Sequence, residues 1–542
     1  MTVYTIGLDG VPPNLIQDGI DSGRLPTFQK MKENGANGFT KSTVPPVSMM
    51  AWSTFATGKE PGNHGVFNFL MKGEDSYEST FADSSLLKST ATPVWEYLDS
   101  RGLQTGVMNI MPGFPASKTS GFHITDHITT PSDGDFAFPP QLQSEIEEKT
   151  NSFQLGPLTG FTGDSEASLE SYVDQFFKIE HERVDVVKSL IEDYNCPAMF
   201  LVFSAPDVFL HEIGHLLDPQ HPEYPKEIPE AYSDLPIQLL ELFDDFLEWL
   251  TERMSETDIL LVLSDHGHGP IYEAVNLNAW LYQSGYLSLD SSPLTQLKQF
   301  GYNHIYPKAE TIMKKLKVYH QVKRTLARDS GGDSGIDLAK FLTISQDDID
   351  WKETQAFTVA GDGQIYINTT EHPNGIISPA DYEEFRSQLI KDIEDMKHTK
   401  TGESIIDEAL KGEDVYGSEY SGTRPDIVCI PNPKYRITFP QTMQSDSFLV
   451  SPQKPAGHSS KEEQYGIFYA YGDQVDTISD ITMSLADYAP TVMGALGMPI
   501  PKGMDGRFRT EIFTDIASPS VEEYQGRIKA KKAIQSLVSN IN

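Results

Sequence analysis

The sequence predicts an α/β protein with a doubly wound, mostly parallel central sheet and helices on both of its faces. Three observations lead to this prediction. Short β-rich apolar runs recur along the chain, amphipathic helical patterns lie between them, and several of the runs end in a carboxylate. Strands that alternate with helices favour a parallel sheet that is covered on both sides. The expected buried strands are VYTIGLD (3–9), AMFLVFS (198–204), ILLVLSD (259–265), DIVCI (426–430) and GIFYAYG (466–472).

The expected helices are marked by their ends or by apolar residues at helical spacing. Pro26 is expected to open a helix that Gly35 ends, and Pro490 to open another within DYAPTVMGALG. Two further helices each gather large apolar side chains on one face. These are Leu169, Tyr172, Val173, Phe176 and Phe177 in the first helix, and Leu239, Leu240, Phe243, Phe246, Leu247 and Leu250 in the second.

The predicted organisation interrupts this core twice. Residues 1–290 form its first part, 291–345 a basic helical insertion, 346–425 a small cap subdomain, 426–515 the second part of the core, and 516–542 a C-terminal helix. Between 298 and 328 there are eight basic residues and one acidic residue, a balance of +7. This segment is either a lid or arm that attracts an anionic substrate, or a solvated face that pairs with acidic neighbours. In the cap, 361–363 reads as a hairpin turn.

Composition excludes several classes of partner. Among 542 residues, acidic residues outnumber basic ones 78 to 42, which gives a net charge of −36. A surface this acidic repels duplex nucleic acid and anionic membranes. Two cysteines, Cys196 and Cys429, are too few for a disulfide framework and are expected to be buried thiols. No signal pattern and no apolar run long enough to span a bilayer is visible, so the expected location is the cytoplasm. Nothing in the sequence indicates an oligomeric state.

Three expected strands deliver carboxylates to one edge of the sheet. Asp9 ends the first strand, Asp207 follows the second, and Asp265 ends the third with His266 next to it. In open α/β sheets, chemistry lies beyond the carboxyl ends of the strands. Each aspartate alone could be a turn former or a helix cap. Their coincidence predicts a site.

A serine lies at the head of another expected helix. In TVPPVSMMAWSTFATGKEPGNHG (43–65), the two prolines end a strand, and Ser48 begins a helix that runs to Gly58. A hydroxyl at this place faces unpaired backbone N–H groups and the positive end of the helix dipole. It could be a nucleophile that attacks an anion, or a simple N-cap.

The stretch HEIGHLLDPQH (211–221) allows a different interpretation. It fits the HExxH pattern of zinc metalloproteases, with His211, His215 and His221 as ligands and Glu212 as the base. That interpretation leaves Asp207, Asp265 and His266 without a role. The glycine that the longer protease pattern requires is also replaced by Asp218.

Taken together, the motifs resemble the alkaline phosphatase superfamily, in particular its type I phosphodiesterase/nucleotide pyrophosphatase branch. The resemblance rests on GLDG (7–10), SMMAWSTFATGKEPGNHG (48–65), DVFLH (207–211), SDHGHG (264–269) and GHSSKEEQYGIF (457–468), with DYAPTVMGALGMPIPKGMDG (487–506) as a late match. It covers most of 1–290 and about 345–510. Each motif alone is weak, but their order is specific. The implied fold is alkaline phosphatase-like.

The resemblance implies a site with two divalent metal ions. Asp9, Asp265 and His266 would hold one ion. Asp207, His211 and His458 would hold the other. Ser48 would be the catalytic nucleophile between the two ions and would form a phosphoseryl intermediate. Mixed carboxylate and imidazole ligands suit Zn²⁺ first, with Mn²⁺ as the alternative, and two metals about 4 Å apart suit in-line displacement at phosphorus.

The sequence departs from that branch at three positions. Ser48 stands where the branch usually has threonine, and Ala51 where it often has a phosphoryl-binding asparagine. His268 stands at a position that is often apolar, as a substrate or outer contact or as a packed residue. No cysteine lies near 48, which argues against sulfatase chemistry.

The predicted function is therefore a metal-dependent phosphoester hydrolase, in the first instance a phosphodiesterase. Its substrate would be a small-molecule, lipid or sugar phosphoester. The alternatives are a phosphomonoesterase or phosphomutase on the same site, a non-catalytic metal-binding protein, and the HExxH-type metalloprotease.

Overall fold

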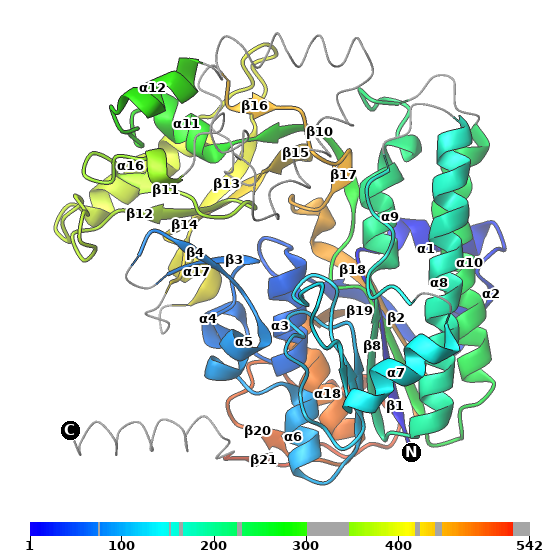
Figure 1. Cartoon of the computed structure of the whole chain (residues 1–542). Helices are drawn as coiled ribbons and strands as arrows, with labels where there is room; N and C mark the ends of the chain where they lie inside the picture. The colour runs from blue at the N-terminus through cyan, green and yellow to red at the C-terminus, as the bar shows by residue number, and fades with distance from the viewer. Residues whose placement is uncertain are drawn as a thin grey trace.

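The computed structural model of the chain describes residues 1–73, 76–150, 153–161, 166–224, 230–300, 346–417, 423–438 and 447–523. Within them, a nine-stranded sheet has the order β19-β2-β18-β9-β1-β8-β5-β6-β7 (Figure 1). From β9 to β6 the neighbouring strands are parallel, whereas β18 and β7 run antiparallel to theirs. The bounds in sheet order are Ile478–Ser484, Ala36–Lys41, Tyr465–Tyr471, Ile259–Leu263, Val3–Leu8, Ala198–Phe203, Thr105–Met108, Phe122–Ile124 and Ala137–Phe138.

Alternate residues of the central strands place their side chains in two hydrophobic cores, one on each face of the sheet. In β8, Phe200 and Val202 join one core, while Leu201 and Phe203 join the other. This is the period of two that a strand buried on both sides requires. Figure 1 shows the covering helices on opposite sides of the sheet. The first core contains α3 (Ser48–Thr57), α6 (Val94–Ser100) and α18 (Tyr488–Ala495); the second contains α1 (Pro13–Asp21), α2 (Pro26–Asn34), α8 (Glu166–Tyr194) and α10 (Leu235–Thr251).

The predicted fold class is thus confirmed, as is the helix that Pro26 opens and Gly35 ends. One helix start was misplaced. α18 begins at Tyr488, and Pro490 lies in its first turn rather than at its first residue. A proline is tolerated there because the first N–H groups of a helix have no partner within the helix.

A second lobe, at the upper left of Figure 1, is built from two smaller sheets. One sheet has the order β11-β12-β14-β13, and the other has β15-β10-β16 with β17 beside β10. Together with α11 (Leu277–Gln283) and α16 (Tyr382–Glu394) they enclose a third core. The strand bounds are Ala356–Phe357, Gln364–Ile367, Ile427–Pro431 and Ile406–Lys411 for the first sheet, and Lys434–Ile437, Gly269–Val275, Leu449–Val450 and Ala456–Gly457 for the second.

The second lobe corrects the expected placement of the strand DIVCI and supports the expected turn at 361–363. The run DIVCI, expected in the central sheet, forms β14 of the second lobe, so that lobe extends past the predicted boundary at 425. An apolar strand buried on both faces has the same pattern in either sheet, and its partners are set by long-range pairing. The turn at 361–363 lies between the antiparallel strands β11 and β12, as a hairpin requires.

Two predicted features fall largely outside the described residues. Of the basic insertion, the structure describes α12 (Pro293–Phe300), while 301–345 lie outside it. Of the predicted C-terminal helix (516–542), 524–542 lie outside it, and the described part, 516–523, contains the short strand β21 (Val521–Glu522) and no helix. Across the described ranges, none of the helices combines the length and apolar character needed to cross a bilayer.

Candidate metal centre

Three neighbouring strands bring three carboxylates to one edge of the central sheet. Asp9 follows β1, Asp265 follows β9, and Asp207 lies in the first turn of α9 (Ala205–Ile213), directly after β8. β9, β1 and β8 are adjacent and parallel, so their carboxyl ends meet. The sheet topology therefore places these residues as the sequence predicts.

The turn after β1 needs Gly10, the second glycine of GLDG. Gly10 has a positive φ of +70°, and a Cβ there would lie 2.7 Å from the Cβ of Asp207. The Gly10 N–H donates to Oδ1 of Asp265 at 3.2 Å. A larger residue would separate Asp207 from the other two carboxylates.

Three histidines point at these carboxylates. His211 lies one helical turn after Asp207, with its Nε2 3.4 Å from Oδ1. The Nε2 of His266 lies 3.2 Å from Asp265 Oδ2 and 3.8 Å from Asp9 Oδ1. The Nε2 of His458 lies 3.8 Å from Asp207 Oδ1. The His266 and His458 rings stack, with centroids 3.7 Å apart.

Backbone carbonyls set the tautomer of all three rings. Nδ1 of His211 lies 2.6 Å from the Ala456 carbonyl, Nδ1 of His458 lies 2.6 Å from the Pro46 carbonyl, and Nδ1 of His266 lies 2.9 Å from the Gly267 carbonyl. A carbonyl only accepts, so each Nδ1 carries the proton and each Nε2 turns a lone pair toward the carboxylates. This backbone support is typical of metal-ligating histidines.

Ser48 is the first residue of α3 and is 5 % exposed. Its Oγ lies 3.0 Å from Nε2 of His266. Because that nitrogen is unprotonated, the Ser48 hydroxyl is the donor. On the same helix, Trp52 donates through Nε1 to Oδ2 of Asp9 at 3.0 Å. Helix α3 is therefore tied to the carboxylate edge at two points.

The arrangement fits divalent cations. Among the described residues, one oxygen on each of Asp9, Asp207 and Asp265 has no hydrogen-bond partner. In each of two sets of residues, Asp9–Asp265–His266 and Asp207–His266–His458, the candidate ligand atoms all lie within 4.8 Å of one another. A third set joins Asp207, His211 and His268. Lone pairs and carboxylates that face one another require positive charge between them, and protons or metal ions can supply it.

Without a cation, burial makes ionisation of this cluster costly. Burial, reinforced by neighbouring carboxylates, raises the pKa of Asp207 to about 7 and that of Asp265 to about 8, and holds the pKa of Asp9 well above its usual range. Burial lowers the pKa of His211 and of His458 well below its ordinary value. A metal ion can therefore displace the protons that the carboxylates hold, and the neutral histidines offer it their free lone pairs.

The metalloprotease geometry does not form. Glu212 accepts from the N–H groups of Gly160 and Phe161 at 2.8 and 3.0 Å and pairs with Lys454. His221 lies 2.9 Å from the Ile271 carbonyl through Nε2 and accepts the Glu223 N–H through Nδ1. Both of its ring nitrogens are therefore used by the backbone. The proposed protease base and third ligand are structural, which excludes that interpretation.

This difference predicts contrasting variants within HEIGHLLDPQH. His211→Gln is expected to reduce the zinc bound per chain, because it removes an inward-facing Nε2. His221→Gln is expected to leave the bound zinc unchanged, since its ring contacts backbone groups. Metal analysis of both folded variants after dialysis measures this. Loss of zinc in His221→Gln alone would restore the protease interpretation.

The sequence analysis left the role of one site residue open and missed another. His268, expected as a substrate or outer contact or as a packed residue, points its Nε2 at Asp207 Oδ1 from 3.7 Å. Arg436 comes from β15 in the second lobe. A Cβ at Gly457 would lie 3.1 Å from both Arg436 Nη1 and His211 Cε1. No local pattern marked Arg436, because the pairing of β10 with β15 brings it there.

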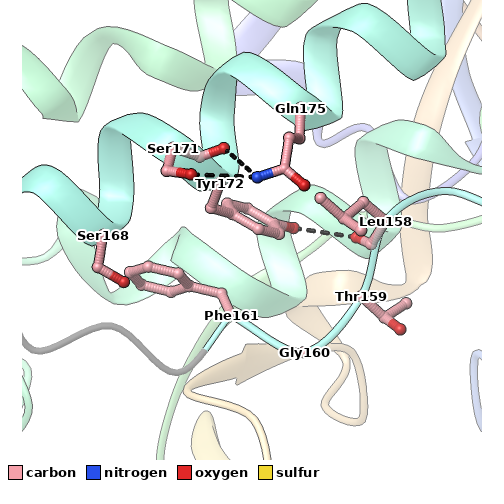
Figure 2. A pocket seen from close by; sticks show the side chains of 8 residues that line it. All are labelled: Leu158, Thr159, Gly160, Phe161, Ser168, Ser171, Tyr172 and Gln175. Atoms are coloured by element: carbon pink, nitrogen blue, oxygen red, sulfur yellow. Dashed lines mark hydrogen bonds between the residues drawn. The ribbon is translucent and has the colours of Figure 1, made fainter.

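The cavity in Figure 2 is separate from this cluster. It lies between α8 and the loop 158–161 and has a volume of about 270 Å³. Tyr172 closes one side and donates to the Leu158 carbonyl at 3.1 Å (Figure 2). The lining includes none of the seven predicted site residues. Its loop is bound to α9 through Glu212, so it supports the helix that carries Asp207 and His211.

The fold, together with the family match, identifies the protein as a phosphoester hydrolase of the alkaline phosphatase superfamily. The chain belongs to the type I phosphodiesterase / nucleotide pyrophosphatase family, whose model matches residues 3–340. This confirms the resemblance that the motifs indicate.

Phosphonoacetate hydrolase shares the fold at low sequence identity. Phosphonoacetate hydrolase from Sinorhizobium meliloti 1021, in complex with phosphonoacetate, is 14 % identical with a TM-score of 0.52, and the match covers 91 % of this chain and 96 % of that chain. Human ectonucleotide pyrophosphatase / phosphodiesterase 5 is 14 % identical with a TM-score of 0.49, and the match covers 95 % and 100 %. No curated protein matched the sequence.

Proposed function

We propose that the protein is a phosphodiesterase that uses two divalent metal ions and Ser48 as its nucleophile. The observation that carries this is the convergence of unpartnered carboxylate oxygens and unprotonated Nε2 atoms in one cluster, with the Ser48 hydroxyl 3.0 Å from one of them, His266 Nε2. Asp9, Asp265 and His266 would hold one ion, and Asp207, His211 and His458 the other. When bound, such ions lower the pKa of a hydroxyl and stabilise charge on phosphoryl oxygens.

The chain's own groups account for the order of bond changes. The Ser48 hydroxyl releases its proton to solvent, Oγ bonds to phosphorus, the bond from phosphorus to the leaving oxygen breaks, and that oxygen takes a proton from solvent. A water oxygen then bonds to the phosphorus, the bond from phosphorus to Oγ breaks, one proton of that water restores the Ser48 hydroxyl, and the other is released. The position of Ser48 at the N-terminus of α3 favours negative charge on the phosphoryl group throughout.

The more exposed side of the cluster is the side from which we expect substrate to enter. The side chains of Asp265 and His266 are fully buried, whereas those of Asp207 and His211 are 13 % and 14 % exposed. Arg436 lies on this more open side, with 22 % of its side chain exposed. The sequence has Ala51 where the family often has a phosphoryl-binding asparagine. Arg436 is well placed to contact the non-bridging oxygens or a nearby anionic group instead.

A comparison of two substrates tests this function. Chelated protein reloaded with Zn²⁺ or Mn²⁺ is expected to hydrolyse bis(p-nitrophenyl) phosphate with a higher kcat/KM than p-nitrophenyl phosphate. A faster monoester reaction on the same preparation would assign a phosphomonoesterase instead. No turnover of either ester with either ion, in protein that binds both ions, would assign a binding protein without catalysis.

Arg436→Met is expected to raise the KM for the diester by about 10-fold or more, since a hydrogen bond from a charged donor is worth about 1.5–3 kcal/mol. Metal content is expected to stay unchanged, because Arg436 is not a ligand. Steady-state kinetics with metal analysis measures both. Arg253→Met, on the surface near Trp249, is the matched control. An unchanged KM in Arg436→Met would remove Arg436 from the substrate site.

A further inference from the structure

His268 is placed against the second group of metal ligands by strand pairing. It directly precedes β10, which pairs antiparallel with β17 through Gly269–Gly457 and Pro270–Ala456. Continued by one residue, this register sets His268 opposite His458. The ring centroids lie 6.1 Å apart, and the His268 ring lies 4.7 Å from that of His211. The pairing of the two strands therefore positions His268 beside Asp207.

The Nε2 of His268 is buried and, among the described residues, has no hydrogen-bond partner; 3 % of the side chain is exposed. A buried polar nitrogen without a partner is costly, and native proteins rarely retain one. The nearest counterpart is Asp207 Oδ1 at 3.7 Å, which is also without a partner. That separation exceeds hydrogen-bond length.

The same separation suits two ligands of one ion. Donor atoms that each lie about 2.1 Å from a tetrahedral zinc ion are about 3.4 Å apart. The distances from Asp207 Oδ1 to Nε2 of His211, His268 and His458 are 3.4, 3.7 and 3.8 Å. All three imidazole nitrogens thus lie 3.4–3.8 Å from one carboxylate oxygen; His211 and His268 form one ligand set with Asp207, and His458 forms another with Asp207 and His266.

We propose that His268 is a fourth protein ligand of the ion that Asp207, His211 and His458 would hold, an ion that would become five-coordinate when substrate binds. This rests on the proposed two-metal function and extends it. The second position then has three imidazoles and one carboxylate, whereas the position at Asp9 has two carboxylates and one imidazole. Imidazole favours Zn²⁺, and carboxylate also accepts Mn²⁺. The Asp207 position therefore selects Zn²⁺, and the Asp9 position accepts either ion.

Metal titration of the full chain, independent of turnover, tests this. Calorimetric titration of chelated wild-type protein with Zn²⁺ alone is expected to show two sites. In His268→Gln, one site is expected to weaken by about 10- to 100-fold or more, while the other is unchanged. His268→Asp is expected to restore the weakened site with a smaller preference for Zn²⁺ over Mn²⁺. His215→Gln, a histidine outside the three ligand groups, is the control and is expected to keep both affinities.

The possible outcomes distinguish failure of the His268 ligand role from failure of the proposed two-metal function. Two wild-type zinc affinities retained in folded His268→Gln would overturn the ligand role. A raised KM in that variant would then make His268 a substrate contact. Fewer than two zinc sites in wild-type protein would instead refute the two-metal function itself.

A measurement on wild-type protein covers the case in which His268→Gln does not fold. Proton NMR of Co²⁺-loaded protein is expected to show shifted ring N–H signals from four coordinated imidazoles, those of His211, His266, His268 and His458. Three such signals would overturn the proposal.

Discussion

Ser48→Ala is expected to lower kcat for a phosphodiester by on the order of 10³-fold or more, because it removes the oxygen that would bond to phosphorus. Metal content is expected to remain near that of the wild type, since the ligands are other residues. Steady-state kinetics on metal-loaded protein measures the loss. In wild-type protein that is acid-quenched during turnover of a phosphodiester, mass spectrometry is expected to find, on the peptide that contains Ser48, a phosphoryl group that still carries the second alcohol of the diester.

Two variants on the same helix sharpen this test. Ser53→Ala removes a buried hydroxyl that donates to the Met49 carbonyl, and it is expected to keep near-normal activity. Ser48→Thr keeps a hydroxyl, as in the family pattern, and is expected to retain part of the activity. Wild-type rates in Ser48→Ala would remove the nucleophile from the mechanism.

Chelation is expected to lower the thermal stability of the protein, and the loss is expected to grow as pH rises from about 6.5 to 8. The raised pKa values of Asp207 and Asp265, about 7 and 8, mean that the folded chelated protein holds protons that the unfolded chain has released. Folded stability from these groups is present at low pH and is lost as pH rises through those values.

The histidines set the lower limit of this window. The lowered pKa values of His211, His268 and His458 act in the opposite direction, but only below about 6.5, where an ordinary histidine begins to charge. Above that pH the carboxylates dominate. Bound ions replace the protons, so zinc-loaded protein is expected not to show this decline.

Thermal unfolding of chelated and zinc-loaded protein across that range measures the difference, and all other titrating groups cancel in the comparison. Asp207→Asn with Asp265→Asn is expected to flatten the chelated curve, because amides do not titrate. Equal pH dependence with and without zinc would contradict the assignment of this cluster as the metal centre.

The strand-end carboxylates could be predicted because their placement follows from local rules. Parallel strands share one carboxyl edge, so Asp9, Asp207 and Asp265 were expected together. His211 was indicated by the family resemblance and by the HExxH pattern, and it lies one helical turn after Asp207. The structure places all four residues within one cluster.

The remaining parts depend on long-range pairing. The link from Pro46 to His458 spans 412 residues, and only the family resemblance indicated it. Arg436 reaches the site through the β10–β15 pair of the second lobe, and no motif in the sequence marks it. For the same reason DIVCI was a recognisable strand in the wrong sheet. His268 was visible, but a lone histidine does not reveal whether it packs or ligates.

The most direct test of the central claim is anomalous diffraction at the zinc edge from crystals of zinc-loaded protein. The account predicts two anomalous peaks close to the Ser48 hydroxyl, one bounded by Asp9, Asp265 and His266, and the other by Asp207, His211 and His458. A single peak, or zinc bound at His215 and His221 instead, would contradict it.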